Sequence, residues 1–373
     1  MLYLHIPFCL SKCIYCGFYS VANTRQKAVY LDALGREIRL RSRYLAGTPV
    51  RTLYFGGGTP SLLSGEELAG ILQTLRNTFQ ITPDAEITLE ANPEQLTPEY
   101  CRTLHDLGIN RLSVGVQSFQ DPVLRFMGRR HTANQALEAI RNAAAAGIDN
   151  ISIDLIFGVS ERSDDQWAED METALSLPIR HLSCYALTPE ENSILYKQIQ
   201  RHTHAPVDDD QATRQYEQLC QRLQHSELHH YEVSNFAREG FESRHNSAYW
   251  DHTPYLGLGP SAHSFDGKSR QWNPANLSQY LHNIEEGRLY EEREMLDEKA
   301  LYNETLLLSL RTREGLDINA LRDRFGTSRV DTLLEYFHSH VPQAHYTETE
   351  SRLRLTEAGL WFADGIAGDA FEI

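Results

Sequence analysis

The sequence lacks the patterns that would place the chain in a membrane or on a nucleic acid. It contains no run of 18 apolar residues, and no charged and apolar signal segment precedes Cys9. Lys and Arg number 35 against 51 Asp and Glu, and the net charge of −16 leaves no electrostatic footprint for phosphate backbones. These absences predict a cytoplasmic globular protein with no membrane span and no nucleic-acid partner.

Two sparse features are expected to be structural. Three of the six cysteines stand alone in the sequence: Cys101, Cys184 and Cys220. Their isolation favours small buried hydrophobes over disulfides. One short basic run, Arg39, Arg41 and Arg43, alternates within a predicted helix, and we expect a solvated helix face there rather than a phosphate site.

The other three cysteines, Cys9, Cys13 and Cys16, lie within eight residues of one another. Thiolates are soft ligands that suit iron-sulfur clusters and zinc. No fourth cysteine follows, because the next residues are Gly17-Phe18-Tyr19. The loop therefore predicts a 4Fe-4S cluster with one iron open to an outside ligand. Structural zinc is the alternative, although zinc sites favour paired C-x2-C units, which the spacing C-x3-C-x2-C does not provide.

Short apolar runs alternate with amphipathic ones up to residue 187. Six runs predict strands, at residues 1–6, 50–55, 85–89, 111–116, 150–156 and 180–187. Helices are predicted at about 24–45, after a capping box that begins at Ser64, from Thr97-Pro98 to Gly108, and at 133–146 and 163–176. Strands that alternate with helices predict a parallel sheet with right-handed crossovers, in which ligands bind at the carboxyl ends of the strands.

Those carboxyl ends carry a set of candidate ligand-binding residues: the three clustered cysteines, Gly57 to Thr59, Glu90 and Asn92, Gln117, Asp154, and Ala186 with Thr188. The glycine run is either a tight turn or a place where backbone approaches the amino group of a ligand. Glu90 and Asp154 are either helix caps and surface acids or acceptors for ribose hydroxyls and an ammonium group. The sequence leaves the structural and the ligand-binding alternatives open for the glycine run and for the two acids.

The motif C-x3-C-x2-C after an apolar strand resembles the radical S-adenosylmethionine (SAM) superfamily, in which SAM chelates the open iron. Six segments together resemble the oxygen-independent coproporphyrinogen III dehydrogenase family: residues 3–9, 56–61, 90–93, 111–119, 128–131 and 154–158. The resemblance covers about residues 1 to 370. Within this family, the sequence is most similar to the haem chaperone branch, because Phe18 stands where the dehydrogenase branch has a fourth cysteine.

The resemblance implies a partial parallel (β/α)6 radical SAM barrel with a smaller, mainly helical C-terminal domain. Its expected divisions are a core at 1–205, a family-specific extension at 206–275 and the C-terminal domain at 276–373. It implies that Cys9, Cys13 and Cys16 hold the 4Fe-4S cluster. The residues that it implies for SAM binding are Tyr3, Tyr15, Gly57, Gly58, Thr59, Glu90, Gln117, Arg129, Asp154 and Ala186.

Beyond residue 206 the strand–helix alternation weakens. The segment His245-Asn-x-x-Tyr-Trp250 resembles the HNxxYW signature of the haem chaperone branch, which implies that His245 is an axial haem ligand and that the aromatic pair packs on the macrocycle. A histidine hydrogen-bonded within a sheet edge or loop is the alternative. A glycine turn at 257–260 precedes His263, a second candidate.

From Asn276 onward the sequence is predicted to be mainly helical, with a covering role over the barrel mouth. Helices are expected there at 300–310, 318–325 and 330–337, and a short strand at 352–355 before a last helix. A further helix is expected earlier, at 208–224, within the extension. No catalytic cluster is recognisable there.

Two functions remain open. The first is a haem chaperone that binds haem and a SAM-liganded 4Fe-4S cluster and passes haem to an acceptor protein, with an electron donor protein and either a transient homodimer or a membrane-associated acceptor as further partners. The second is a dehydrogenase that oxidatively decarboxylates coproporphyrinogen III. Phe18 and His245 with Tyr249-Trp250 favour the first.

Overall fold

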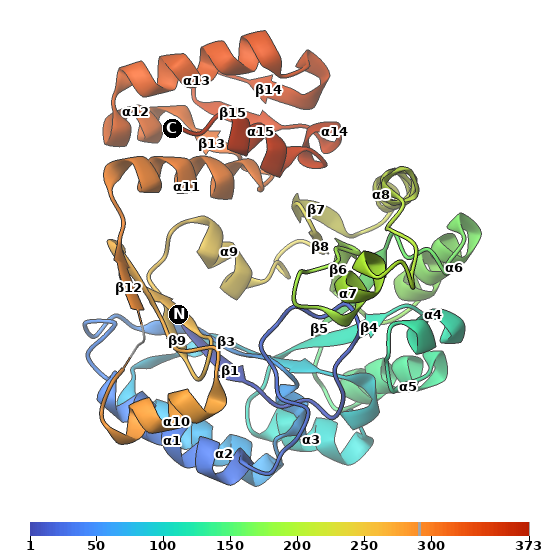
Figure 1. The fold of residues 1–373 in the computed structure, drawn as a ribbon, viewed down its shortest axis with the longest axis vertical. Coiled ribbons are helices and arrows are strands. Elements are labelled where there is room, and N and C mark those ends of the chain that lie inside the picture. The colour runs from blue at the N-terminus through green and yellow to red at the C-terminus, as the bar shows by residue number, and fades with distance from the viewer. Residues whose placement is uncertain (290–291, 373) are drawn as a thin grey trace.

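The computed structural model describes residues 1–289 and 292–372, and within them a central sheet contains the six predicted strands (Figure 1). They are β1 (Leu2–Ile6), β2 (Val50–Gly57), β3 (Ile81–Ala91), β4 (Arg111–Gln117), β5 (Asn150–Phe157) and β6 (His181–Ala186). All six run parallel and neighbour one another in sequence order. The predicted α/β fold with a partial (β/α)6 barrel is confirmed.

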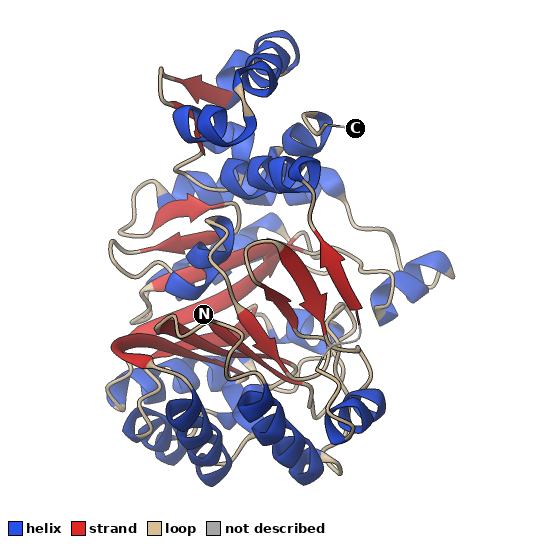
Figure 2. Cartoon of the chain, turned by 90° about the vertical axis from the view of Figure 1, so that its left-hand side faces the viewer, coloured by secondary structure: helices blue, strands red, loops and turns tan. Residues whose placement is uncertain are grey.

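Helices cover the outer face of this sheet, as Figure 2 shows along its lower side. They are α1 (Lys27–Leu40), α2 (Gly65–Thr78), α3 (Pro98–Asp106), α4 (Asp121–Phe126), α5 (Ala133–Ala145) and α6 (Asp164–Leu175). The predicted start signals are confirmed, because Ser64 and Glu67 form a capping box and the Thr97 side chain accepts from the Tyr100 N–H. Local side-chain chemistry thus sets where these helices begin.

The strands alternate between an apolar face and a polar face. Leu53 and Phe55 of β2 pack in the core beneath the helices, whereas Thr52 and Tyr54 point to the inner face and make polar contacts. Because the side-chain period of a strand is two, every second residue of β2 to β6 faces the barrel interior. This alternation puts the polar residues of several strands in one place.

After β6 the chain returns to both edges of the sheet. The elements are α7 (Ile194–Gln200), α8 (Asp209–Leu223), β7 (His229–Glu232), β8 (Asn235–Ala237), α9 (Arg244–Trp250) and β9 (Leu256–Leu258). Strand β8 pairs antiparallel with β6, and β9 pairs parallel with β1. The glycine turn expected at 257–260 was wrong at its start, since Gly257 lies in β9. The turn begins at Gly259, whose φ of +93° favours glycine.

Two small sheets and a group of helices follow. The first sheet contains β10 (His263–Phe265), β11 (Ser269–Trp272) and β12 (Glu292–Met295), and the second contains β13 (Leu316–Asp317), β14 (Tyr346–Glu348) and β15 (Arg352–Leu355). The helices are α10 (Leu277–Glu285), α11 (Glu298–Leu310), α12 (Ile318–Phe325), α13 (Thr327–His340), α14 (Glu357–Leu360) and α15 (Ala363–Asp369). The sequence had indicated only β15 among these strands, because β10, β13 and β14 have only two or three residues and the four residues of β11 and of β12 are mainly polar.

The C-terminal part has a hydrophobic core of its own. Buried side chains from α11 to α15 form a cluster separate from the barrel core, which confirms the mainly helical C-terminal domain. Helix α10 packs in the barrel core through Leu277, Tyr280 and Ile284 although it follows residue 276. The division at residues 205 and 275 stays a prediction.

The basic run Arg39, Arg41 and Arg43, which spans the end of α1 and the turn after it, departs from the expectation at one residue. Arg39 and Arg43 are exposed, but Arg41 is only 4% exposed and pairs with Glu37 at 3.3 Å. Its guanidinium also donates to Ser264 Oγ and Asn273 Oδ1, each at 3.2 Å. The solvated face was therefore wrong for Arg41, because segments more than 200 residues away in sequence cover that side of α1.

The three isolated cysteines behave as predicted. Cys101, Cys184 and Cys220 are buried and form no disulfide. Among the described residues, every helix is too short or too polar to cross a bilayer.

Candidate functional site

The cysteine loop connects β1 to α1 and is fixed by one backbone hydrogen bond within the loop and by two to other segments. The Cys9 N–H donates to the Val21 carbonyl at 3.1 Å, and the Ile14 N–H donates to the Met127 carbonyl at 3.2 Å. The Ile14 carbonyl accepts from the N–H of Leu195 at 2.8 Å, just inside α7. The loop has little regular structure of its own, so these contacts hold its shape.

The three loop cysteines are half-buried, and two of their sulfurs have polar neighbours. Thr59 Oγ1 is 3.4 Å from Cys9 Sγ, and Arg129 Nη1 is 3.5 Å from Cys13 Sγ. Burial raises the pKa of the Cys16 thiol, and the neighbouring sulfurs of Cys13 and Cys9 raise it further, so the three interact electrostatically. Three soft donors with a guanidinium beside them fit a 4Fe-4S cluster that leaves one iron open.

The glycine run at the end of β2 packs against the start of this loop. A Cβ on Gly58 would lie 2.7 Å from the Phe8 carbonyl oxygen, and Gly57 has a φ of +105°. The N–H of Gly57 donates to Glu90 Oε2 at 3.1 Å. Close packing at Gly58 and the positive φ at Gly57 therefore already favour glycine at these positions, and their contact with SAM stays a prediction. Thr59, only 5% exposed, turns its hydroxyl toward Cys9.

Glu90 and Asp154 lie within strands β3 and β5 and face the barrel interior, so neither is a helix cap or an ordinary surface acid. Tyr54 donates to Glu90 Oε1 at 2.8 Å, and Ser113 donates to Asp154 Oδ1 at 3.3 Å. Burial raises the pKa of Glu90 to about 7, with a further contribution from the charge of Asp154. Burial likewise raises the pKa of Asp154 to about 6. A cationic ligand such as a sulfonium would favour ionisation of both acids.

Arg129 and Gln117 define the other side of the interior. Arg129 Nη2 donates to Asn92 Oδ1 at 2.7 Å and to the Gly115 carbonyl at 2.6 Å, which fixes the guanidinium beside Cys13. Gln117 has a φ of +70°, a left-handed conformation that costs a non-glycine residue about 1–3 kcal/mol. The register between β4 and β5 shifts at this point. Such strain is concentrated at functional sites, in agreement with a role for Gln117 in binding.

The remaining predicted SAM residues lie around this group. Tyr3 stacks on Tyr54 with ring centroids 6.0 Å apart. Tyr15 lies next to Cys13 and Arg129, whose charges both act on its hydroxyl. Ala186 ends β6, opposite Phe157 of β5. The structure thus gathers the loop and the ends of β1 to β6 at one mouth, while each SAM contact remains a prediction.

The sequence prediction missed the partners of the two acids. Tyr54 holds Glu90, and Ser113 together with Ser183 holds Asp154. These partner residues point to the same side of their strands as other inward-facing residues. Tyr54, for example, lies two positions after Thr52 on β2, and both face the interior. The strand period of two would have found them once the strands were known.

His245 is a buried residue on the short helix α9. Its Nδ1 lies 2.8 Å from Thr52 Oγ1, and its Nε2 lies 3.2 Å from the Tyr249 hydroxyl. The ring stacks on Tyr54 with centroids 4.9 Å apart, and its exposed fraction is 1%. Burial lowers the pKa of His245 to about 3, so the imidazole is neutral. Both ring nitrogens are occupied, and ligation of haem by this residue stays a prediction.

The end of the HNxxYW signature faces a cavity instead. A cavity of about 620 Å³ lies between α9 and helices α11 and α12, and Trp250 and His252 line it. The buried indole Nε1 of Trp250 has no acceptor among the described residues. The second candidate, His263, is exposed and stacks on Trp272, and it does not line this cavity.

Comparison with known proteins first defines the class. A model of the radical SAM superfamily matches residues 3–174, and a model of the HemN C-terminal domain matches residues 296–362. The solved structure of coproporphyrinogen III oxidase (HemN) from Escherichia coli, a radical SAM enzyme, superposes with a TM-score of 0.87 at 25% identity, over 99% of this chain and 89% of that one. The fold is that of a radical SAM protein, and that class has a 4Fe-4S cluster and SAM as its cofactors.

Curated relatives narrow the class. A protein named haem chaperone HemW from Mycobacterium tuberculosis (strain CDC 1551 / Oshkosh) is 37% identical, over 98% of this chain and 93% of its own length. The HemW of Bacillus subtilis (strain 168) is 32% identical, over 98% and 97%. The chain belongs to the haem chaperone HemW family. The resemblance and the branch that Phe18 favoured are both confirmed.

Proposed function

We propose that the protein binds haem and passes it to an acceptor protein, and that its SAM-liganded 4Fe-4S cluster controls this transfer. The observation that carries the proposal is Phe18. It occupies the position of the fourth cysteine of the dehydrogenase branch, and its side chain is 71% exposed at the edge of the cluster loop. An exposed aromatic ring at this position supplies no thiol chemistry but does supply apolar contact area.

The cavity beside α9 is where we place the haem. Its volume of about 620 Å³ lies within the range of about 300–1,000 Å³ typical of cofactor sites. Arg313, Arg324 and Arg352 are among its lining residues, and arginine pairs with carboxylates such as haem propionates through two parallel hydrogen bonds. Four acids also line the cavity, and Arg352 already pairs with one of them, Asp317, at 3.5 Å. Trp250 contributes an aromatic ring and an unpartnered N–H.

Two imidazoles compete for the role of axial ligand. His245 is the residue that the family signature implies, but its Nε2 contacts the Tyr249 hydroxyl. Helix α9 would therefore have to move before this nitrogen could bind iron. His252 already lines the cavity, and its Nε2 makes one contact, with Thr305 Oγ1 at 3.2 Å. Neutral imidazole is the commonest ligand of haem iron. We infer that His252 is the first imidazole that haem meets.

The further partners are part of the same proposal. Leu10 and Phe18 are both exposed on the cluster loop, and a second copy of the chain, an electron donor or a membrane-associated acceptor would cover such apolar side chains on docking. Whether SAM is cleaved depends on the electron donor, because reductive cleavage needs an electron from outside the chain.

A haem titration of the anaerobically reconstituted full chain tests the function. We expect about one haem per chain with a Soret band that shifts in His252→Ala or His245→Ala, whichever histidine ligates the iron, and that is unchanged in the matched control His263→Ala. Coproporphyrinogen III oxidation is the second candidate function, favoured by the TM-score of 0.87 to HemN. Many turnovers of coproporphyrinogen III without a haem-dependent spectrum at micromolar haem would replace the chaperone with the enzyme.

A further inference from the structure

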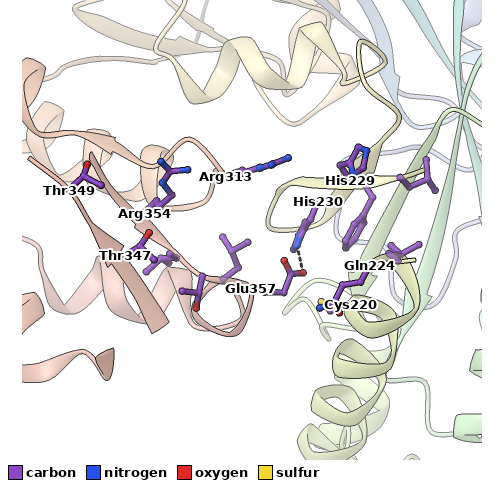
Figure 3. Close-up of a pocket in the computed structure, with 15 residues that line it drawn as sticks. Cys220, Gln224, His229, His230, Arg313, Thr347, Thr349, Arg354 and Glu357 are labelled. Carbon is purple, nitrogen blue, oxygen red and sulfur yellow. Dashed lines mark hydrogen bonds and ion pairs between the residues drawn. The ribbon is translucent and has the colours of Figure 1, made fainter. Parts of the chain in front are cut away.

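Three potential metal ligands meet where the C-terminal domain contacts the barrel. Cys220 near the end of α8, His230 on β7 and Glu357 at the start of α14 place their ligand atoms within 4.8 Å of one another. Figure 3 shows these side chains converging from three elements at the edge of a cavity of about 520 Å³. Glu357 lies more than 120 residues from the other two, so only the folded chain assembles the group.

The imidazole of His230 is oriented as in metal sites. Its Nδ1 faces Glu357 Oε1 at 2.7 Å, and its Nε2 faces the Val233 carbonyl at 3.3 Å. The ring also stacks on Phe236 with centroids 4.1 Å apart and planes 19° apart. Metal-bound histidine almost always donates its second N–H to a carbonyl or carboxylate, which fixes the ring and the tautomer. The Val233 carbonyl provides that acceptor here.

The donor set selects the metal. A thiolate, an imidazole and a carboxylate suit zinc, whereas calcium and magnesium require oxygen ligands. With three protein ligands, the fourth position of a tetrahedral zinc site is left to water or an anion. Glu357 is 41% exposed, so the site is open to solvent, and Arg313 and Arg354 line the same cavity, where they would attract an anionic fourth ligand.

We propose that Cys220, His230 and Glu357 form a zinc site that joins α8 and β7 to α14 of the C-terminal domain. When zinc binds, it displaces to solvent the protons that the thiol, the imidazole and the carboxylate hold in its absence. Because its ligands come from both sides of the domain contact, bound zinc stabilises that contact and restricts movement of the C-terminal domain against the barrel. The site is distinct from the cysteine loop and does not depend on the haem proposal.

Zinc titration of the reconstituted full chain, with its 4Fe-4S cluster in place, tests the site. We expect one zinc per chain, measured by metal analysis and by competition with a chromophoric chelator. Loss of an outer-shell partner alone lowers metal affinity about tenfold to a hundredfold. Cys220→Ser and His230→Gln each remove a ligand, so each should lower zinc affinity by more than that. Glu357→Gln, which retains the side-chain shape, should also weaken it. The matched controls are His229→Gln, from the same cavity, and Cys101→Ser, a buried cysteine elsewhere.

X-ray absorption at the zinc edge separates this site from zinc misplaced in the cysteine loop. Our site has one sulfur near 2.3 Å and nitrogen or oxygen neighbours near 2.0–2.2 Å, whereas the loop would give three sulfurs. Three sulfurs per zinc, no binding at micromolar zinc, or unchanged affinity in both Cys220→Ser and His230→Gln would overturn the proposal. The group would then be an imidazole–carboxylate pair beside a buried thiol. None of these outcomes depends on whether the chain binds haem.

Discussion

The cysteine loop and the group formed by Cys220, His230 and Glu357 are both sets of three possible metal ligands, but they differ in how the chain brings them together. The first set lies within eight residues, and its spacing, with no fourth cysteine after it, predicted a 4Fe-4S cluster with one open iron, with structural zinc as the alternative. The second set is drawn from α8, β7 and α14, and nothing in the sequence spacing points to it. Local sequence therefore reveals sites that a loop can build, and hides those that depend on tertiary packing.

Loss of the loop cysteines should have the largest effect. Cys9→Ser, Cys13→Ser and Cys16→Ser should each abolish the 4Fe-4S cluster, because hydroxyls are poor ligands for iron-sulfur clusters. Iron and sulfide counts per chain after anaerobic reconstitution measure this loss, against four of each in the unmodified protein.

Cys220→Ser is the matched variant for this comparison. It should leave the cluster intact, because Cys220 is buried on α8 and is not part of the cysteine loop. If Cys220, Cys101 or Cys184 proved necessary for the cluster, the separation between the two ligand sets would fail.

The second prediction concerns a buried network assembled from distant segments. Glu37→Gln should lower the free energy of unfolding by about 3–5 kcal/mol, because it leaves Arg41 as an uncompensated buried charge. Glu37 also accepts from the Gly259 N–H and the Tyr280 hydroxyl, each at 2.8 Å. Denaturant unfolding measures the loss, with the exposed Asp32→Asn on the same helix as control. A loss below 1 kcal/mol would show that this network is as replaceable as a surface contact.

The third prediction tests the strand-end acids. Glu90→Ala and Asp154→Ala should each weaken SAM binding roughly tenfold to a hundredfold, because a charge-assisted hydrogen bond contributes about 1.5–3 kcal/mol. Calorimetry on the reconstituted protein measures the affinity, and the iron content should not change. Unchanged SAM affinity in both variants would leave the acids with a structural role only.

The sequence predicted the barrel well because its signals are local. Strand alternation, the capping box at Ser64 and the cap at Thr97 each depend on residues within a few positions. The burial of Arg41 could not be predicted, because Ser264 and Asn273 reach it from over 200 residues away. The hydrogen-bond partners of His245 could not be predicted either, because Thr52 and Glu86 come from strands that are far from α9 in the sequence. Spacing identifies which residue types are present, and packing decides which of them are accessible.

The fourth prediction follows from the pKa values of the same acids. Without ligand, burial raises the pKa of Glu90 to about 7 and that of Asp154 to about 6. The sulfonium of SAM favours the ionised carboxylates, so binding lowers both pKa values and releases protons. SAM affinity should therefore rise from pH 5.5 to 7.5, by at most about tenfold per pH unit for each group, and level off above that range. Glu90→Gln should flatten the upper part of this profile. An affinity that increased toward low pH would contradict the assignment.

The smallest effect should come from a feature that the sequence encodes entirely locally. The Ser64 side chain accepts from the Glu67 N–H at 3.2 Å, and Glu67 Oε2 accepts from the Ser64 N–H at 2.8 Å. Ser64→Ala removes one of these two bonds at a solvent-exposed helix start, where water replaces part of the loss. It should lower the free energy of unfolding by about 1 kcal/mol, and the exposed Ser42→Ala serves as control. If Ser64→Ala cost as much as Glu37→Gln, locally encoded contacts would carry as much stability as assembled ones, and the contrast between the two kinds of region would apply only to ligand sites.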